Sequence, residues 1–391
     1  MAFLFKKKPA ELCKNLLKHL TSPQEETDTG EEKGKKDEKI AGIVVQIRVM
    51  LYGDEETEPK IVNIQKLRDE LTNENNLLII LIQGIPTFDL KTQKEVVKIV
   101  TFFLRRGRQN AFVEYFSAHL KIIGILMKGY EDKRVAMHHG PIIRECIAHK
   151  ELCTIFLDIT HVSKFFELVR QPSADLASDV FITLRKLLFD HKSAAGRFLD
   201  ANYETIFDDY FVTLLSSENF VTRKKALTLL HDLLLEKKNQ KQLFRYVSDT
   251  KHLKSIMNML RIKKIVLQFA VFDVFKLFLA NTRKSPSIVK ILHTNRDILK
   301  GFLEKLEIEG NPEFVADKQF LLRQLDELEL LKPQDDDETK IPHPSPSTNS
   351  PATDADDVSD TVRSEKPNDT PQSKKNIKPE ASRETSSGNG T

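Results

Sequence analysis

Tryptophan is absent from this chain of 391 residues, and glycine is scarce, with only 14 residues. Few stretches alternate threonine, valine or tyrosine with polar residues. An all-β sandwich or propeller needs such alternation together with many turn residues, so the sequence argues against these folds. Hydrophobic residues nevertheless make up 40% of the chain, which is enough for a large core.

The chain also lacks an excess of either charge. Its 60 basic and 57 acidic residues give a net charge of +3. A nucleic-acid-binding protein usually concentrates a basic excess on one face, so we expect no nucleic-acid partner. No apolar run approaches about 18 residues, so we expect no membrane span. At the N-terminus the lysines follow a very short apolar run, which is the reverse of the order in a secretory signal peptide.

Cysteine is rare as well. Cys13, Cys146 and Cys153 are too few and too scattered for a disulfide framework. An odd number of cysteines is typical of a reducing compartment. We therefore expect a cytoplasmic protein.

The sequence is rich in helical periodicity, which is clearest from Ser217 to Leu235. Asn219 is a predicted N-cap, because its side chain can accept hydrogen bonds from the free N–H groups of the first turn. Apolar residues then recur at helical spacing and form one stripe: Ala226, Leu227, Leu230, Leu233 and Leu234. Lys224, Thr228 and His231 lie on the opposite side. We predict a packed helix whose polar face is free to meet a partner.

A similar pattern recurs along the chain, in which an apolar residue ends a helical segment just before a charged cluster. Its members are Leu104, Ile147, Leu188, Leu234 and Phe278. The steps between them are 43, 41, 46 and 44 residues. HEAT and armadillo arrays have a period of about 40–47 residues, because each unit buries its apolar face only against its neighbours. We predict an all-α, armadillo/HEAT-like helical-repeat solenoid over residues 1–332.

Two segments depart from this pattern. Residues 21–39 carry mixed charge and two glycines, which predicts a solvated linker. Residues 333–391 are rich in serine, proline and aspartate and have few aliphatic residues, which predicts a disordered tail. In this tail Ser345, Ser350 and Thr370 each precede a proline. They are either proline-directed phosphorylation sites or the ordinary composition of such a tail.

No local signature indicates catalysis. The chain has no phosphate-binding glycine loop, no G-x-S-x-G elbow, no H-E-x-x-H motif and no calcium-loop pattern. Cys146, His149 and Cys153 would share one face of a single helix, where they are either zinc ligands or buried core residues. A zinc site would need a fourth ligand from His138 or His139. We favour core packing, and predict a non-enzymatic protein with no cofactor and no metal.

Basic clusters also recur near the repeat ends, at 223–225, 237–241 and 261–264. Stacked repeats would bring these clusters close together. They are either a solvated face or a positively charged ridge for an acidic protein partner. RNA or DNA is a poorer match, because no aromatic residues are interleaved with the charges.

Several blocks of this chain, in order and at matching spacing, resemble the mouse-protein-25 scaffold family, also called calcium-binding protein 39, with the Hym proteins of fungi. The densest blocks are LMKGYE (126–131), IIRECIAHKELC (142–153), LASDVFITLRKLLFDHK (176–192), LLSSENFVTRKKALTLLHDLLLEKKNQ (214–240) and the segment 253–284. The resemblance covers nearly all of Phe3 to Lys332. It implies an armadillo-like solenoid whose concave side grips kinase folds.

The resemblance also implies the partners. Family members bind a pseudokinase adaptor, hold it in an active-like closed shape and so help to activate the tumour-suppressor kinase in a three-part complex. They also activate germinal-centre kinases directly. A scaffold that binds only the ordered state of a kinase shifts its population toward that state.

The family has a pocket for the aromatic and acidic C-terminal tail of the adaptor, and this chain differs from the family there. The family's aromatic residue falls at Ala174, and its arginine at Lys224, beside Arg223. Its second basic residue falls at Thr228, and its methionine is retained as Met257.

The family's kinase-contacting patch is changed too, with Lys237 in place of an arginine and Gln240 in place of a phenylalanine. Lysine lacks the planar fork that arginine offers a carboxylate, so tail capture should be weaker. The sequence therefore indicates a divergent member of the family that binds a kinase or pseudokinase. The alternative is a general armadillo-type adaptor for acidic peptides with a changed partner.

Overall fold

The computed structural model describes residues 8–22, 30–55, 58–106, 111–262, 264–306 and 311–328. All of them belong to one compact unit, Met1–Pro333. Every regular element among them is a helix. No helix in these ranges is long and apolar enough to cross a membrane. The predicted all-α class is confirmed for the part of the chain that the structure describes.

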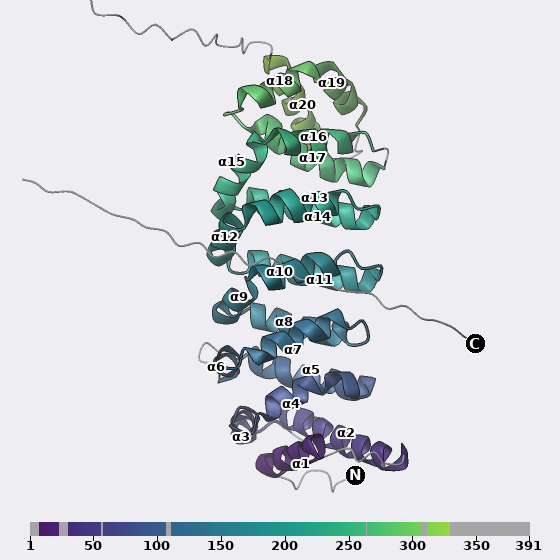
Figure 1. The fold of residues 1–391 in the computed structure, drawn as a ribbon, viewed down its shortest axis with the longest axis vertical. Coiled ribbons are helices and arrows are strands. Elements are labelled where there is room, and N and C mark those ends of the chain that lie inside the picture. The colour runs from purple at the N-terminus through teal and green to yellow at the C-terminus, as the bar shows by residue number, and fades with distance from the viewer. Residues whose placement is uncertain are drawn as a thin grey trace, which may run out of the picture. The chain divides into compact units, whose positions relative to one another are not determined.

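The elements follow one another along the chain as α1 (Pro9–Thr21), α2 (Gly30–Tyr52), α3 (Ile61–Leu71), α4 (Leu77–Gln83), the 3₁₀ helix η1 (Ile85–Thr87), α5 (Leu90–Leu104), α6 (Ala111–Ala118), α7 (Lys121–Glu131), α8 (Ala136–Ile147), α9 (Lys150–Phe156), α10 (Ile159–Leu168), α11 (Ala174–Phe189), α12 (Lys192–Ala201), the π-helix η2 (Glu204–Phe211), α13 (Val212–Leu215), α14 (Phe220–Leu235), the 3₁₀ helix η3 (Lys237–Asn239), α15 (Gln240–Ser248), α16 (Thr250–Leu260), α17 (Ile265–Ala280), α18 (Pro286–Thr294), α19 (Arg296–Lys305) and α20 (Pro312–Glu327) (Figure 1).

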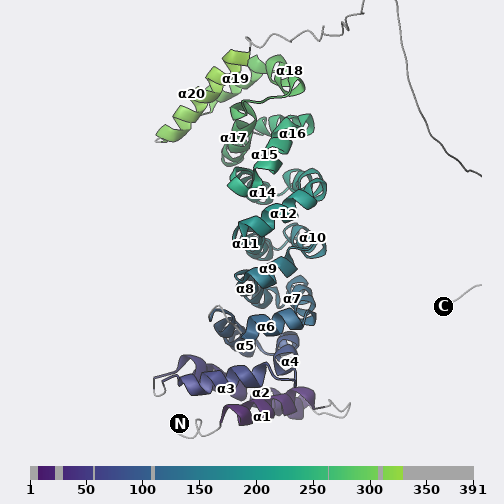
Figure 2. The same ribbon diagram turned by 90° about the vertical axis from the view of Figure 1, so that its left-hand side faces the viewer.

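One series of helices runs through the whole stack, and we call its members the spine helices: α2, α5, α8, α11, α14, α17 and α20. Each spine helix contacts the next one, a full repeat further along the chain. The helices α7, α10, α13, α16 and α19 each pack against the spine helix that follows them. Figure 2 shows the spine helices along one side and α4, α7, α10 and α16 along the other. This is the predicted armadillo/HEAT-like arrangement of helical units.

The predicted period is confirmed by where its markers fall. Leu104 and Ile147 are the last residues of spine helices α5 and α8. His149 Nε2 lies 2.6 Å from the carbonyl oxygen of Leu104, and His191 Nε2 lies 3.0 Å from that of Ile147. A carbonyl has no proton, so each ring nitrogen donates. These bonds satisfy carbonyls that the end of a helix leaves free, and they tie each repeat to the next.

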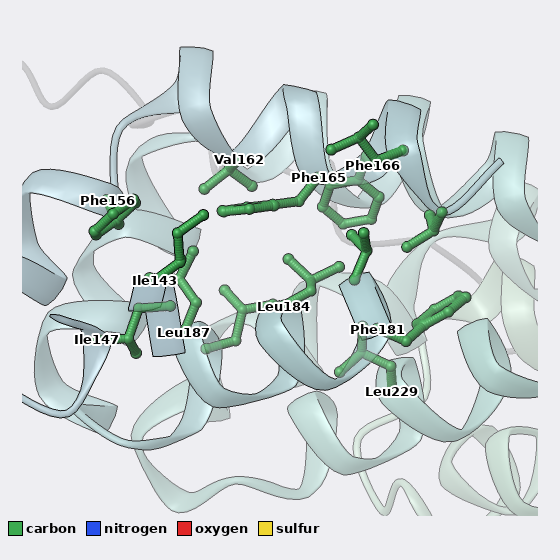
Figure 3. Packing of buried hydrophobic residues seen from close by; sticks show 14 of the residues in the cluster. Ile143, Ile147, Phe156, Val162, Phe165, Phe166, Phe181, Leu184, Leu187 and Leu229 are labelled. Carbon is green, nitrogen blue, oxygen red and sulfur yellow. The ribbon is translucent and has the colours of Figure 1, made fainter. Parts of the chain in front are cut away.

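The hydrophobic core is continuous between repeats. Figure 3 shows side chains from α8, α9, α10 and α11 packed together, with Leu229 of α14 entering from the next repeat. All of these labelled side chains are buried. Phe181 is the most exposed of them, at 7%. Because every unit buries its apolar face against its neighbours, no single repeat has a complete core of its own.

The helix predicted from Ser217 to Leu235 is α14. Asn219 caps it as expected, since its Oδ1 accepts from the N–H groups of Val221 and Thr222 at 2.9 and 3.4 Å. Every residue of the predicted apolar stripe is buried. Lys224 and Thr228 are exposed on the other side.

The linker predicted at 21–39 is wrong over most of its length. Thr21 ends α1, and α2 begins at Gly30, so residues 30–39 are helical. Glu31 and Glu32 stand four residues before Lys35 and Lys36, a spacing that stabilises a helix. Residues 23–29 lie outside the described residues. So does the predicted disordered tail, 333–391, with its three proline-directed sites.

Candidate partner-binding surface

Four of the expected site residues lie near the first turns of two neighbouring spine helices. Lys225 Nζ of α14 lies 2.6 Å from Ser178 Oγ of α11. Further along, Arg185 of α11 pairs with Asp232 of α14 at 2.5 Å. Both contacts join residues 47 apart, so the two helices lie side by side in one register.

That register places exposed Ala174, in the first turn of α11, level with the first turn of α14. Lys224 and Thr228 follow one and two turns further along α14 and are also exposed. Arg223 is partly buried, and its Nε has no hydrogen-bond partner among the described residues. We call Ala174, Arg223, Lys224 and Thr228 the N-terminal group.

The other two exposed residues of the expected site lie beyond the opposite end of α14. Lys237 begins η3 and Gln240 begins α15. Buried Asn239 holds this turn in place, because its Nδ2 donates to the carbonyl oxygen of Leu233 at 2.9 Å. From Lys224 to the end of α14 the helix axis runs about 17 Å. Six of the seven expected site residues therefore form two separate groups, and we call Lys237 and Gln240 the C-terminal group.

Met257 lines a pocket of 440 Å³ between α16, α18 and α19. The basic residues Lys254, Arg261 and Lys290 surround it, and no residue of its lining is acidic. Asn258, Thr294 and Asn295 add uncharged polar groups to the lining, and the remaining side chains are apolar: Leu260, Ile291, Ile298, Leu299 and Phe302. A cavity with cations at its rim and apolar walls suits a segment that carries both a carboxylate and an aromatic ring.

The sequence singled out Met257 and the basic cluster that contains Arg261, but it did not indicate that they share a pocket with α18 and α19. Lys290, Ile298 and Phe302 come from α18 and α19, and no local pattern shows that these helices face α16. The sequence did carry one signal, because Ile298 lies outside the buried stripe of an amphipathic helix. In the structure this residue is 65% exposed. An isoleucine outside the buried stripe of such a helix is a candidate for a binding surface.

The single helix expected to carry Cys146, His149 and Cys153 does not exist. α8 ends at Ile147 and α9 begins at Lys150, and His149 between them has extended backbone, with φ −98° and ψ 127°. Its Nε2 donates a hydrogen bond to the carbonyl oxygen of Leu104. Both cysteines are buried, and burial raises their thiol pKa, that of Cys153 to about 12. Such thiols are poor nucleophiles and are typical of core residues.

A protein-family model described as Mo25-like matches residues 3–329. The chain belongs to the Mo25-like family. Human calcium-binding protein 39-like is 37% identical over 331 residues, which cover 84% of this chain and 97% of that protein. The Mo25-like protein of Schizosaccharomyces pombe is 32% identical, with 84% and 100% covered. The conidiophore development protein hymA of Emericella nidulans is 27% identical, with 83% and 93% covered.

Solved structures similar to this Mo25-like chain include a designed armadillo repeat protein. Its TM-score is 0.41 at 13% sequence identity, and the match covers 68% of this chain and 100% of that one. A second, computationally designed armadillo repeat protein for modular peptide recognition has a TM-score of 0.41 at 14% identity, with 62% and 98% covered.

Proposed function

We propose that this Mo25-like chain is a non-enzymatic scaffold that binds a protein kinase or pseudokinase and favours its active conformation. Membership of the Mo25-like family supports this function. The candidate partners are a pseudokinase adaptor of a tumour-suppressor kinase and germinal-centre kinases. Binding would act by population shift, because a rigid surface that fits only one state of a kinase stabilises that state by its difference in affinity.

The partner would contact both groups of site residues. The N-terminal and C-terminal groups lie at the two ends of α14, so a ligand must extend about 17 Å to reach both. A folded kinase lobe is large enough for this, whereas a peptide of three or four residues is not. In this proposal the cytoplasm, expected from the cysteine content, is where the complex forms.

The pocket at Met257 would bind an acidic and aromatic tail of the partner. Lys254, Arg261 and Lys290 supply the positive charge, and Phe302 with its apolar neighbours supplies the wall for a ring. Three cations at the pocket offset the absence of an arginine fork at Lys224. Tail binding should therefore weaken as the salt concentration rises.

The second candidate function is a general adaptor for acidic peptides. The same pocket supports it, because its lining has cations and no acidic residue. The two functions differ in what is bound. A kinase scaffold needs a folded kinase domain, whereas a peptide adaptor binds an isolated acidic segment with its full affinity.

The deciding experiment is a binding assay of the purified chain against kinase domains of germinal-centre kinases, the pseudokinase adaptor and acidic peptides with a terminal aromatic residue. Kinase activity is measured with and without the chain. We expect binding to a kinase-fold domain and a rise in its activity. Binding to the peptides alone would support the adaptor function, and the absence of any kinase-fold partner would contradict the scaffold function.

A further inference from the structure

Two carboxylates and an imidazole converge between two neighbouring repeats. Asp208 lies in the π-helix η2, whereas Asp249 and His252 lie at the start of α16. One donor atom from each of the three side chains lies within 4.8 Å of the other two. Asp208 and His252 are 44 residues apart, so this cluster joins one repeat to the next at the period of the whole stack.

The imidazole of His252 is held in a fixed position. Only 3% of this residue is exposed, and its ring stacks on Tyr246 with 4.0 Å between the ring centroids. Its Nε2 lies 2.8 Å from Oδ1 of Asp208. Both atoms are buried, and apart from this close approach neither has a hydrogen-bond partner among the described residues. A neutral imidazole nitrogen and a carboxylate oxygen this close together can also bind one metal ion between them.

A third buried polar atom lies nearby without a partner. The hydroxyl of Tyr203 makes no hydrogen bond to any described residue, and only 2% of this residue is exposed. Burial raises its pKa, and the negative charges of Asp208 and Asp249 raise it further. Arg245 lies over the Tyr203 ring, but its charge is paired with Glu204. A buried hydroxyl almost always has a partner, so an additional group at this position is indicated.

The two elements present these ligands in different ways. η2 is a π-helix, a form that is rare and often found at functional sites. Asp249 is the N-cap of α16 and uses one oxygen, Oδ1, to accept from the N–H group of Lys251 at 2.7 Å. Its second oxygen has no hydrogen bond to a described residue, and a carboxylate can use both oxygens at once.

We propose that Asp208, Asp249 and His252 bind one divalent transition-metal ion, and that this ion links two adjacent repeats. Zn²⁺ fits best, because it accepts imidazole nitrogen and carboxylate oxygen together and tolerates a water as its fourth ligand. That water would give the Tyr203 hydroxyl its partner. Ca²⁺ fits poorly, since it needs six to eight oxygen ligands.

The test uses the full chain, stripped of metal with a chelator and then titrated with Zn²⁺, Co²⁺ or Ca²⁺ in a calorimeter. We expect one Zn²⁺ per chain, weaker binding of Ca²⁺, and a melting temperature that keeps rising with the logarithm of the free Zn²⁺ concentration. The Co²⁺ complex should lack thiolate charge-transfer absorption, because the three ligands are nitrogen and oxygen. Such absorption would assign the metal to the cysteines and overturn the proposal.

Two conservative variants identify the ligands. Asp249→Asn keeps an N-cap acceptor while it removes the charge, and Asp208→Asn changes a side chain that is 38% exposed. Each should weaken Zn²⁺ binding at least about tenfold, since even changes behind the ligands of a metal cost this much. Asp209→Asn, on the next residue of η2, is the matched control and should bind as wild type.

The melting temperature of each variant in chelator shows whether it folds without metal. Unchanged Zn²⁺ affinity in both folded ligand variants overturns the proposal. So does the absence of any one-to-one binding in the wild type, which would leave His252 and Asp208 as an ordinary buried ion pair. The two experiments are independent. If the chain binds zinc at this site but no kinase partner, the zinc site is supported and the scaffold function is contradicted.

Discussion

At the scale of single residues, one buried polar network joins α7, α8 and α11. Tyr130 donates to Asp179 Oδ2 at 2.5 Å, and Arg144 NH1 donates to the same oxygen at 2.9 Å. Thr183 accepts from Arg144 at 2.8 Å. Gly140 allows the close approach, because a Cβ there would lie 2.3 Å from Asp179 Oδ2. The network connects two spine helices through buried and partly buried polar groups that pair with one another.

Asp179→Ala should lower the free energy of unfolding by about 3–5 kcal/mol, because it leaves Arg144 with an uncompensated buried charge. Asp232→Ala is the control. It breaks the more exposed pair with Arg185, and should cost about 1 kcal/mol or less. Urea unfolding of the two variants measures both values. Equal losses would show that the network is no more important to the fold than a surface ion pair.

Buried His139 makes stability depend on pH. Its Nδ1 donates to the carbonyl of Val135 at 3.0 Å, and burial holds its pKa below the usual value. Below about pH 6.5 the unfolded chain therefore binds a proton at this residue that the folded chain does not, so stability falls as the pH decreases. His139→Gln should lose less stability between pH 7 and pH 5 than the wild type. An identical pH dependence of the midpoint of urea unfolding would contradict this assignment.

At the scale of helices, the sequence predicted the features that depend on residues close together in the chain. Asn219 and the apolar stripe that follows it defined α14. The break at His149 was missed, and the hydrogen bond that holds this residue in place is made to Leu104, one repeat earlier. Most of the pocket at Met257 was missed for the same reason, since packing between helices distant in sequence creates it.

Asn219→Ala should destabilise the chain by about 1 kcal/mol, because the first N–H groups of α14 lose their acceptor. Asn219→Asp should restore nearly all of this, since aspartate caps as well as asparagine and its charge favours a helix N-terminus. The difference between the two variants in thermal unfolding isolates the cap from other effects of the position. Equal stability of alanine and aspartate would show that the cap does not contribute.

At the scale of the whole stack, the two groups of site residues distinguish a folded partner from a peptide. Lys224→Glu and Lys237→Glu each reverse one exposed charge without disturbing the core. Each should weaken the binding of a kinase domain by roughly 1 kcal/mol. The two positions are more than about 10 Å apart, so the effects should add in the double variant. Lys150→Glu on α9 is the control for an exposed lysine outside the spine, and should bind as wild type.

A short acidic peptide would respond differently, because it cannot reach both groups at once. Its affinity should be unchanged by Lys237→Glu, even where Lys224→Glu weakens it. Additive losses with a kinase domain, together with this selective response of the peptide, would show that one folded ligand contacts both groups along α14. If both variants leave kinase binding at the wild-type level, the partner surface lies elsewhere on the stack. Exposed Ile298 and the basic residues Lys254, Arg261 and Lys290 of the pocket between α16, α18 and α19 would then be the next positions to change.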